Sequence, residues 1–282
     1  MTEILKGSVV AAKIKDDISK KLTELKNNDK YPTLGIVRLG QNPSDISYEK
    51  SIIKNCDNIG IKSKVFENEI TFTTEELVNF INELNNDNEI SGILLFRPLP
   101  KHIDEELIRN TINPAKDVDC MHPLNLEKIF EGDMTGFLPA TPTAAMEILL
   151  HNNIELEGKN VVVINRSMVV GKPLAMMLLE KNATVTICHS RTKNLEELTQ
   201  RADIVITALG KPKFFTEKYF TEKSIVIDVG VGMTEDNKIS GDADYENLVN
   251  LVDKITPVPG GVGSVTTTIL LNQVVNACIN NC

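Results

Sequence analysis

Apolar residues along the chain alternate between helical spacing and short continuous runs. Near the start, Ala11, Ile14, Ile18, Leu22 and Leu25 recur at the spacing of one helix face, which predicts an amphipathic helix. A short apolar run bounded by turn residues predicts a buried strand instead. By these patterns the first half of the chain carries predicted strands at 33–40, 61–67 and 91–100, and predicted helices at 44–59, 73–87 and 104–112.

The second half of the chain repeats the alternation more regularly, and its Pro/Gly-rich segment 256–264 precedes a predicted terminal helix at 265–279. Strands that alternate with helices build a parallel sheet covered by helices. We therefore predict an α/β fold of two units, divided near residues 120–145, with a ligand cleft between them. The predicted strands are 159–165, 183–190, 203–210 and 224–230, and the helices among them are 141–153, 171–182 and 194–202.

The composition argues against several classes of function. The 282 residues carry a net charge of -9 and a pI near 5.1, which argues against general binding to nucleic acids or anionic membranes. The charged N-terminus and the lack of an apolar run of about 20 residues predict neither a signal peptide nor a spanning helix. The scattered cysteines, without a CxxC motif, predict reduced cytoplasmic thiols and no metal site. The cysteines are Cys56, Cys120, Cys188, Cys278 and Cys282.

The segment KNVVVINRSMVVGKPLA (159–175) reads as a strand, a tight turn and a helix. The free N–H groups at such a helix N-terminus suit a phosphate. The fingerprint GxGxxG is not intact, because Asn165 stands where a first glycine is expected and Gly171 opens the helix. Asn tolerates a left-handed backbone better than most residues. A plain strand–helix turn without a ligand remains an alternative at this point.

The next predicted strand ends in Ser190 and Arg191, about 20 residues beyond the turn. An acidic residue at this place suits the ribose hydroxyl of NAD, whereas a basic or hydroxyl residue suits the extra phosphate of NADP. Together with Arg166, these residues favour NADP over NAD. The alternative is a solvated loop.

The glycines Gly260, Gly261 and Gly263 lie between prolines and the terminal helix. Prolines and glycines in this arrangement build rigid backbone that a ligand can approach closely. The alternative is an ordinary loop before a helix.

Taken together, these segments resemble the methylenetetrahydrofolate dehydrogenase/cyclohydrolase family over nearly the whole chain. The motifs that carry the resemblance are GQNPSDISY (40–48), GILLFRPLP (92–100), PAKDVD (114–119), PATPTA (139–144), NRSMVVGKP (165–173), CHSRT (188–192), ADIVITALGKP (202–212), VIDVG (226–230), GDAD (241–244) and TPVPGGVGSVT (256–266).

The resemblance implies a cytoplasmic homodimer with a folate cleft between two domains. The first would be a three-layer α/β catalytic domain, 1–140, completed by the C-terminal helix 264–282, and the second a Rossmann-like NADP-binding domain, 141–263. It also implies oxidation of methylenetetrahydrofolate by NADP and, in bifunctional members, hydrolysis of the methenyl product. The implied nucleotide contacts are Asn165, Arg166, Ser167, Ser190 and Val231, and the implied folate contacts are Tyr48, Asp119, Pro259 and Gly260, beside which Gly261 would allow close approach.

The family's catalytic lysine lies four residues after the tyrosine, and here that position is Ile52. On a helix, position 52 lies roughly 40° from Tyr48, whereas Lys50 and Lys54 lie roughly 200° and 240° round and point away. The family's partner glutamine corresponds to Phe96. Neither substituted side chain can move a proton, so we expect a dehydrogenase with little or no cyclohydrolase activity and a separate cyclohydrolase in the same pathway.

Two alternatives remain. The first is the full bifunctional enzyme, with Lys50 or Lys54 reaching the site through a distorted helix. The second is a non-catalytic folate- or nucleotide-binding protein, against which the retained nucleotide turn and Asp119 argue. Smaller departures from the family, at Asn165, Cys120 and Ser264, are expected to tune geometry without removing binding.

Overall fold

The computed structural model describes residues 1–280, so the last two residues of the predicted helix 264–282, including Cys282, lie outside the described part. The chain forms two compact units. The six-stranded unit consists of Met1–Ala12 and Pro139–Thr266, and the three-stranded unit consists of Lys13–Leu138 and Thr267–Cys282. The predicted domain limits of 140 and 263 stay a prediction.

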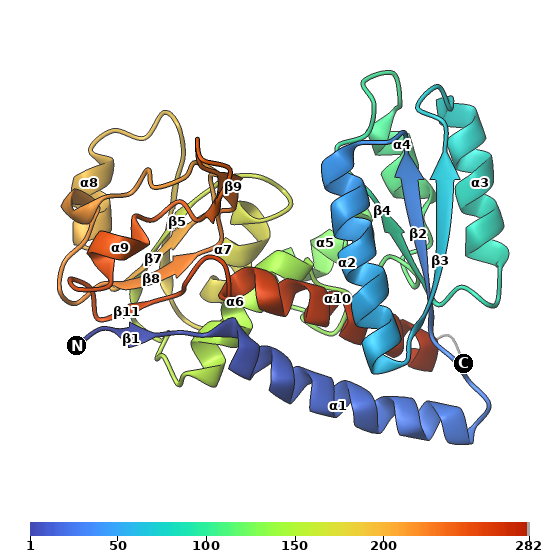
Figure 1. Cartoon of the computed structure of the whole chain (residues 1–282), viewed down its shortest axis with the longest axis horizontal. Helices are drawn as coiled ribbons and strands as arrows, with labels where there is room; N and C mark the ends of the chain where they lie inside the picture. Colours follow the sequence, from blue (N-terminus) through green and yellow to red (C-terminus); the bar gives the residue numbers. More distant parts are fainter. Residues whose placement is uncertain (281–282) are drawn as a thin grey trace. The chain divides into compact units, whose positions relative to one another are not determined.

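The three-stranded unit is built on a parallel sheet in the order β3-β2-β4, with helices beside it (Figure 1). All three strands, and all the helices of this unit except α5, were predicted from the sequence. The strands are β2 (Thr33–Leu39), β3 (Lys62–Asn68) and β4 (Gly92–Leu95), and the helices are α2 (Pro43–Ile59), α3 (Thr74–Asn86), α4 (Glu105–Thr111) and α5 (Pro123–Phe130), with most of α1 (Gly7–Asn27) and α10 (Val262–Asn280).

Helix α3 shows how local sequence sets an element in this unit. Thr73 and Glu76 form a reciprocal capping box that satisfies two free N–H groups at the start of the helix, which is worth about 1 kcal/mol. At the other end, the buried Lys116 ammonium donates to the carbonyl oxygens of Leu84 and Asp87, at 3.0 and 2.7 Å. The helix is therefore fixed at both ends by side chains.

The six-stranded unit is built on a parallel sheet in the order β1-β11-β8-β7-β5-β6. The central strands are rich in Val and Ile and almost fully buried, as expected for a sheet covered on both faces. The strands are β1 (Glu3–Ile4), β5 (Asn160–Ile164), β6 (Thr184–Cys188), β7 (Ile204–Thr207), β8 (Ile225–Asp228) and β11 (Lys254–Ile255). An antiparallel hairpin, β9 (Gly232–Met233) with β10 (Ile239–Ser240), and the helices α6 (Ala140–His151), α7 (Gly171–Leu179), α8 (Leu195–Gln200), η1 (Glu217–Tyr219) and α9 (Tyr245–Leu248) complete the unit.

The strand order places a topological switch point beside β5. The chain passes from β5 to β6 on one side and then returns to β7 on the other side. In this parallel register Ile164 pairs with both Cys188 and Thr207, and Thr207 pairs with Asp228. The loops that follow β5, β6, β7 and β8 therefore meet at one edge, where open α/β sheets bind their ligands.

Helix α10 contradicts the expectation that no apolar run approaches the length of a membrane span. It has 19 residues with a mean hydropathy of 1.3, and 61% of its most apolar window is buried. The core helices of soluble proteins have the same length and composition, so this helix is weak support for a membrane span. It also begins at Val262, ahead of both predicted starts, 264 and 265.

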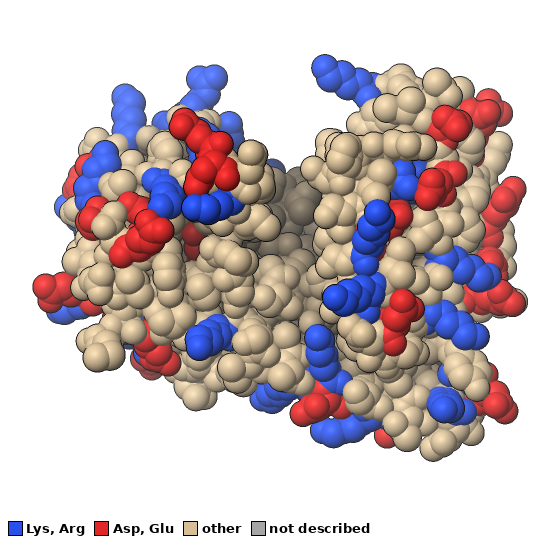
Figure 2. Space-filling view, in the orientation of Figure 1, with Lys and Arg blue, Asp and Glu red and all other residues tan. Residues whose placement is uncertain are grey.

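Charged side chains of both signs are interspersed over the face of the molecule drawn in Figure 2. This face carries no broad basic patch, in keeping with the net charge of -9.

Candidate functional site

Tyr48 of α2 stacks on Phe96, which directly follows β4. The ring centroids lie 5.7 Å apart with an interplanar angle of 29°. Phe96 is buried, whereas Tyr48 is 42% exposed and its hydroxyl forms a hydrogen bond with Thr267. Burial of the hydroxyl, followed by the negative charge of Asp119, raises the pKa of Tyr48 to about 12. Tyr48 is therefore a neutral aromatic surface at physiological pH and not a base.

Asp119 is paired with Arg97, which the sequence analysis did not single out. The guanidinium Nη2 lies 2.8 Å from Oδ2 of Asp119, and both side chains are largely buried. Burial raises the pKa of Asp119, and the Arg97 charge opposes that shift. The residue after Asp119, Cys120, has φ +55°, a left-handed conformation that glycine adopts without strain. A ligand that binds Asp119 therefore meets a carboxylate already held by a cation.

Helix α2 is continuous from Pro43 to Ile59 and turns one face to the core. Ile52 is fully buried on this face, together with Glu49 and Cys56. Lys50 and Lys54 are exposed. Both lysine side chains therefore point away from the buried face, in agreement with the helical angles.

A buried ion pair beneath α2 was not predicted from the sequence. Arg38 of β2 is 2% exposed, and its Nε lies 2.9 Å from Oε2 of Glu49 on α2. The same guanidinium pairs with Glu67 of β3 at 3.0 Å and donates to the carbonyl oxygen of Gly40. These contacts fix α2 against the sheet at the residue next to Tyr48.

Asn165 shapes the turn after β5 through its side chain. Its backbone is not among the positive-φ residues, so the turn does not use the tolerance of Asn for a left-handed conformation. Its side-chain Oδ1 instead accepts hydrogen bonds from the N–H groups of Ser167 and Gly171, at 2.7 and 3.1 Å. Its Nδ2 donates to the carbonyl oxygen of Ala208, at 2.6 Å. A Cβ atom added to Gly171 would lie 2.0 Å from the Asn165 carbonyl oxygen, so this close turn requires glycine there.

The other predicted nucleotide residues lie on loops at the same edge of the sheet. Arg166, Ser167, Ser190 and Arg191 are exposed, and Val231 is 57% exposed. Among residues 1–280, neither arginine has an ion-pair partner, so both charges are free to meet a phosphate.

The turn that carries Ser190 and Arg191 is held by two neighbours that the sequence analysis did not single out. The N–H of Arg191 donates to Nδ1 of His189 at 3.2 Å, and the N–H of His189 donates to the Thr192 hydroxyl at 2.8 Å. These local bonds give the loop a defined shape without a ligand.

The predicted folate residues are distributed over both units. Tyr48 and Asp119 belong to the three-stranded unit, and the segment Pro259–Gly261 belongs to the six-stranded unit. Gly260 has φ +103°, and its carbonyl oxygen accepts from the N–H of Gly7 at 2.9 Å. A Cβ on Gly7 would lie 2.0 Å from the Gly261 carbonyl oxygen. These glycines therefore have a packing role at the start of α1, and their contact with folate stays a prediction.

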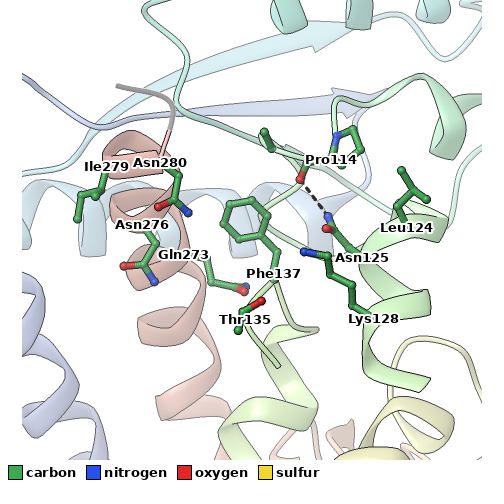
Figure 3. Close-up of a pocket in the computed structure, with 12 residues that line it drawn as sticks. Pro114, Leu124, Asn125, Lys128, Thr135, Phe137, Gln273, Asn276, Ile279 and Asn280 are labelled. Carbon is green, nitrogen blue, oxygen red and sulfur yellow. Dashed lines mark hydrogen bonds between the residues drawn. The ribbon is translucent and has the colours of Figure 1, made fainter. Parts of the chain in front are cut away.

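A cavity of about 440 Å³ in the three-stranded unit contains none of the predicted site residues. Side chains of α5, of the segment 135–137 and of α10 face it (Figure 3). Its buried amides are already bonded within the protein: Asn125 donates to the Pro114 carbonyl oxygen, and Gln273 accepts from the N–H of Leu138. The cavity therefore offers few free groups, and we assign it no function. Within residues 1–280 no group of three or more His, Cys, Asp or Glu side chains could hold a metal ion.

Comparisons with known proteins agree along the whole chain. Residues 5–119 match the tetrahydrofolate dehydrogenase/cyclohydrolase catalytic domain, and residues 139–282 match its NAD(P)-binding domain. The chain is 54% identical over 281 residues to the bifunctional protein FolD of Clostridium botulinum (strain Langeland / NCTC 10281 / Type F), with 100% of both chains covered.

Two solved structures extend the similarity. The bifunctional enzyme FolD from Campylobacter jejuni, a methylenetetrahydrofolate dehydrogenase/cyclohydrolase, has a TM-score of 0.97 and 40% identity, with 100% of both chains covered. The methylenetetrahydrofolate dehydrogenase-cyclohydrolase of Trypanosoma brucei, complexed with NADP cofactor and inhibitor, has a TM-score of 0.93 and 29% identity, with 99% of this chain and 98% of that chain covered.

Proposed function

Because the chain belongs to the tetrahydrofolate dehydrogenase/cyclohydrolase family, we propose that it oxidises 5,10-methylenetetrahydrofolate to 5,10-methenyltetrahydrofolate with NADP and has weak or no cyclohydrolase activity. The observation that carries the second part is the complete burial of Ile52, one helical turn beyond Tyr48.

Membership in the family confirms the predicted two-domain α/β fold with a Rossmann-like domain, and the predicted NADP cofactor. The residues at the edge of the six-stranded sheet fit this cofactor. The α7 N-terminus and the turn built by Asn165 suit a pyrophosphate, and Arg166 and Arg191 suit the additional phosphate of NADP. We propose Ser167, Ser190 and Val231 as further contacts.

The dehydrogenase step depends on orientation more than on acid–base groups. Bound NADP supplies the hydride acceptor, and the protein must hold the folate carbon against it. Tyr48 offers a neutral aromatic face for the folate rings, and Asp119 offers a carboxylate for the amino-rich edge of the pterin. We propose that Pro259, Gly260 and Gly261 complete the folate site.

The hydrolytic step needs side chains that help water to add and that transfer protons. Under this proposal the chain lacks such side chains at the two family positions. Ile52 and Phe96 are hydrocarbon side chains, and both are buried. General acid–base groups contribute roughly 10²- to 10⁴-fold to such a step. Their loss would leave hydrolysis of the methenyl product close to its uncatalysed rate, and a separate cyclohydrolase would then act on that product.

Full bifunctionality is the second candidate. It is favoured by the 54% identity, over the full length, to a protein named bifunctional FolD. It would require a proton-transfer group other than Ile52 and Phe96, and the exposed Lys50 and Lys54 are the nearest lysines along α2.

Two assays with purified protein test the proposal. NADPH formation from methylenetetrahydrofolate should be rapid, and decay of methenyltetrahydrofolate should stay at the buffer rate. The double variant Ile52→Lys/Phe96→Gln should then accelerate that decay by roughly tenfold or more.

Brisk decay with the wild-type protein would instead establish the bifunctional enzyme. Loss of that decay in Lys50→Met or Lys54→Met would identify the lysine responsible. Tight binding of both ligands without either reaction would point to a non-catalytic binding protein.

We further propose a cytoplasmic homodimer whose folate domain is 1–140 with 264–282 and whose NADP domain is 141–263. Sedimentation of the purified chain as a species of twice 31.2 kDa would support the dimer, and a monomer at micromolar concentration would contradict it.

A further inference from the structure

Two buried carboxylates interlock at the carboxyl edge of the six-stranded sheet. Asp228 ends β8 and is 3% exposed, and Asp242 follows β10 and is fully buried. Each occupies the space that a side chain would need at a nearby glycine. A Cβ on Gly230 would lie 2.1 Å from Cγ of Asp242, and a Cβ on Gly241 would lie 2.0 Å from Oδ2 of Asp228. The two glycines therefore make room for the two carboxylates.

Asp242 holds the loop that follows β7. Its two carboxylate oxygens accept hydrogen bonds from the N–H groups of Leu209 and Lys211, each at 2.5 Å. The N–H of Gly210 between them also interacts with this carboxylate. Three consecutive backbone N–H groups thus converge on one carboxylate. That carboxylate belongs to a segment more than 30 residues later in the sequence than the loop it holds.

Asp228 holds Asp242 in turn. Its Oδ1 accepts hydrogen bonds from the Thr207 hydroxyl at 2.9 Å and from the N–H groups of Gly230 and Asp242 at 3.1 Å. Its Oδ2 accepts from the N–H of Ala243 at 2.8 Å. The ends of β7 and β8 and the segment after β10 are joined through this one carboxylate.

This network reaches the phosphate turn through Asn165. The Asn165 amide donates to Ala208, the residue directly before the loop held by Asp242. A dinucleotide crosses such a sheet at the switch point, with its adenosine half on the side of β6. Its nicotinamide half therefore falls on the side of β7 and β8, where this loop lies.

The loop presents an apolar surface at this place. Leu209 is 36% exposed, and Val231, on the loop after β8, is 57% exposed. The two loops touch, because a Cβ on Gly210 would lie 3.4 Å from the carbonyl oxygen of Val231. Exposed apolar side chains from adjoining loops suit one face of an aromatic ring.

We propose that Asp242 is a positioning residue for hydride transfer, which holds the Leu209–Lys211 loop so that Leu209 and Val231 form an apolar support for the nicotinamide ring. Leu209 becomes a further cofactor contact, and Asp242 acts through the loop without touching the cofactor. The inference rests on the proposed NADP-dependent function and assigns the nicotinamide side of that site.

The test uses Asp242→Asn in the full chain. An amide offers one acceptor oxygen and an NH₂ group that opposes the remaining N–H donors, so the loop loses at least one of its bonds. Binding of NADPH and of 2′,5′-ADP is measured side by side, because the second ligand lacks the nicotinamide half. We expect roughly tenfold weaker NADPH binding and a roughly tenfold lower kcat, with 2′,5′-ADP affinity unchanged within about twofold.

Two further variants keep the test decisive if Asp242→Asn folds poorly. Leu209→Ala leaves the carboxylate network intact and should weaken NADPH binding roughly fivefold, again without an effect on 2′,5′-ADP. Asp253→Asn makes the same change at an exposed carboxyl of the same unit and should change neither affinity.

Equal losses for both ligands in Asp242→Asn, or unchanged NADPH affinity in Leu209→Ala, would overturn the positioning role. Failure of the wild-type chain to bind either ligand would overturn the proposed NADP site itself, so the two failures are distinguishable.

Discussion

At the carboxyl ends of β5 and β6, Arg166 and Arg191 have no ion-pair partner among the described residues, whereas beyond the end of β4 Arg97 is already paired with Asp119. At the ends of β5 and β6 the arginine charges are available to an anionic ligand, and polar groups of the protein, such as the Asn165 side chain, hold the loops in shape. Beyond β4 the charges of Arg97 and Asp119 are already paired with each other. The two positions Ile52 and Phe96 carry buried hydrocarbon side chains. Under the proposed function, orientation of the reactants and proton transfer are separate demands on the enzyme, and this chain retains the groups for orientation.

Removal of Arg38, which fixes the helix that carries Tyr48, is expected to have the largest effect on stability. Arg38→Met leaves Glu49 buried without its cation and should lower the free energy of unfolding by about 4 kcal/mol. The measurement is urea denaturation. The double variant Arg38→Met/Glu49→Leu should recover most of the loss, because both charges are then gone. A double variant as unstable as the single one would contradict this account.

On the nucleotide side, the buried carboxyl group of Asp228 makes the stability of the protein depend on pH. Burial, with a further contribution from Asp242, raises the pKa of Asp228 to about 7. The folded state therefore holds a proton that the unfolded state releases near pH 4. The stability from this group is fully present below about pH 4 and is lost as pH rises through 7, by an amount on the order of 4 kcal/mol.

Stability measured against pH for wild type and Asp228→Asn checks this expectation. The wild-type chain should lose its advantage over the variant between pH 4 and 7. Glu222→Gln, at an exposed carboxyl, should show no such difference. A wild-type advantage that grows with pH would reverse the assigned direction.

A weaker effect, on the choice between NADP and NAD, is expected at the arginines without an ion-pair partner. Arg191→Ala should raise KM for NADP roughly tenfold, about 1.4 kcal/mol, and leave KM for NAD nearly unchanged, since only NADP carries the additional phosphate. The ratio of kcat/KM for the two cofactors measures this effect. Lys193→Ala removes a neighbouring exposed charge and is the matched control. Equal changes in kcat/KM for both cofactors would mean that Arg191 does not bind the additional phosphate of NADP.

The long helices and strands could be predicted from the sequence because the apolar residues in each recur at the spacing of a helix or form the short continuous run of a buried strand. The strands and helices between Thr33 and Thr111 follow from apolar spacing alone. The two-residue strands β1, β9, β10 and β11 are too short to show a period. Helix α5 could have been found, because Pro123 stands at its first position and His122 caps it.

The site could be predicted only in part. Motif order predicts which loops carry function, and that assignment stays a prediction, whereas the partner of a buried charge is determined by the fold. Arg97 and Asp119 are 22 residues apart, and no local pattern joins them. Asn165 was predicted as a nucleotide contact, but its side chain also holds the turn together from within, which only the register of β5 with β7 reveals.

The pairing of β1 with β11 has a consequence for how the chain is made. The hydroxyl of Thr2 donates to the carbonyl oxygen of Val252, 250 residues later, and Glu3 lies opposite Lys254. A ribosome that adds about 5–20 residues per second needs tens of seconds to produce that partner. Strand β1 therefore stays without its partner strand for most of that time, and any chaperone that attends this protein during synthesis meets β1 unpaired.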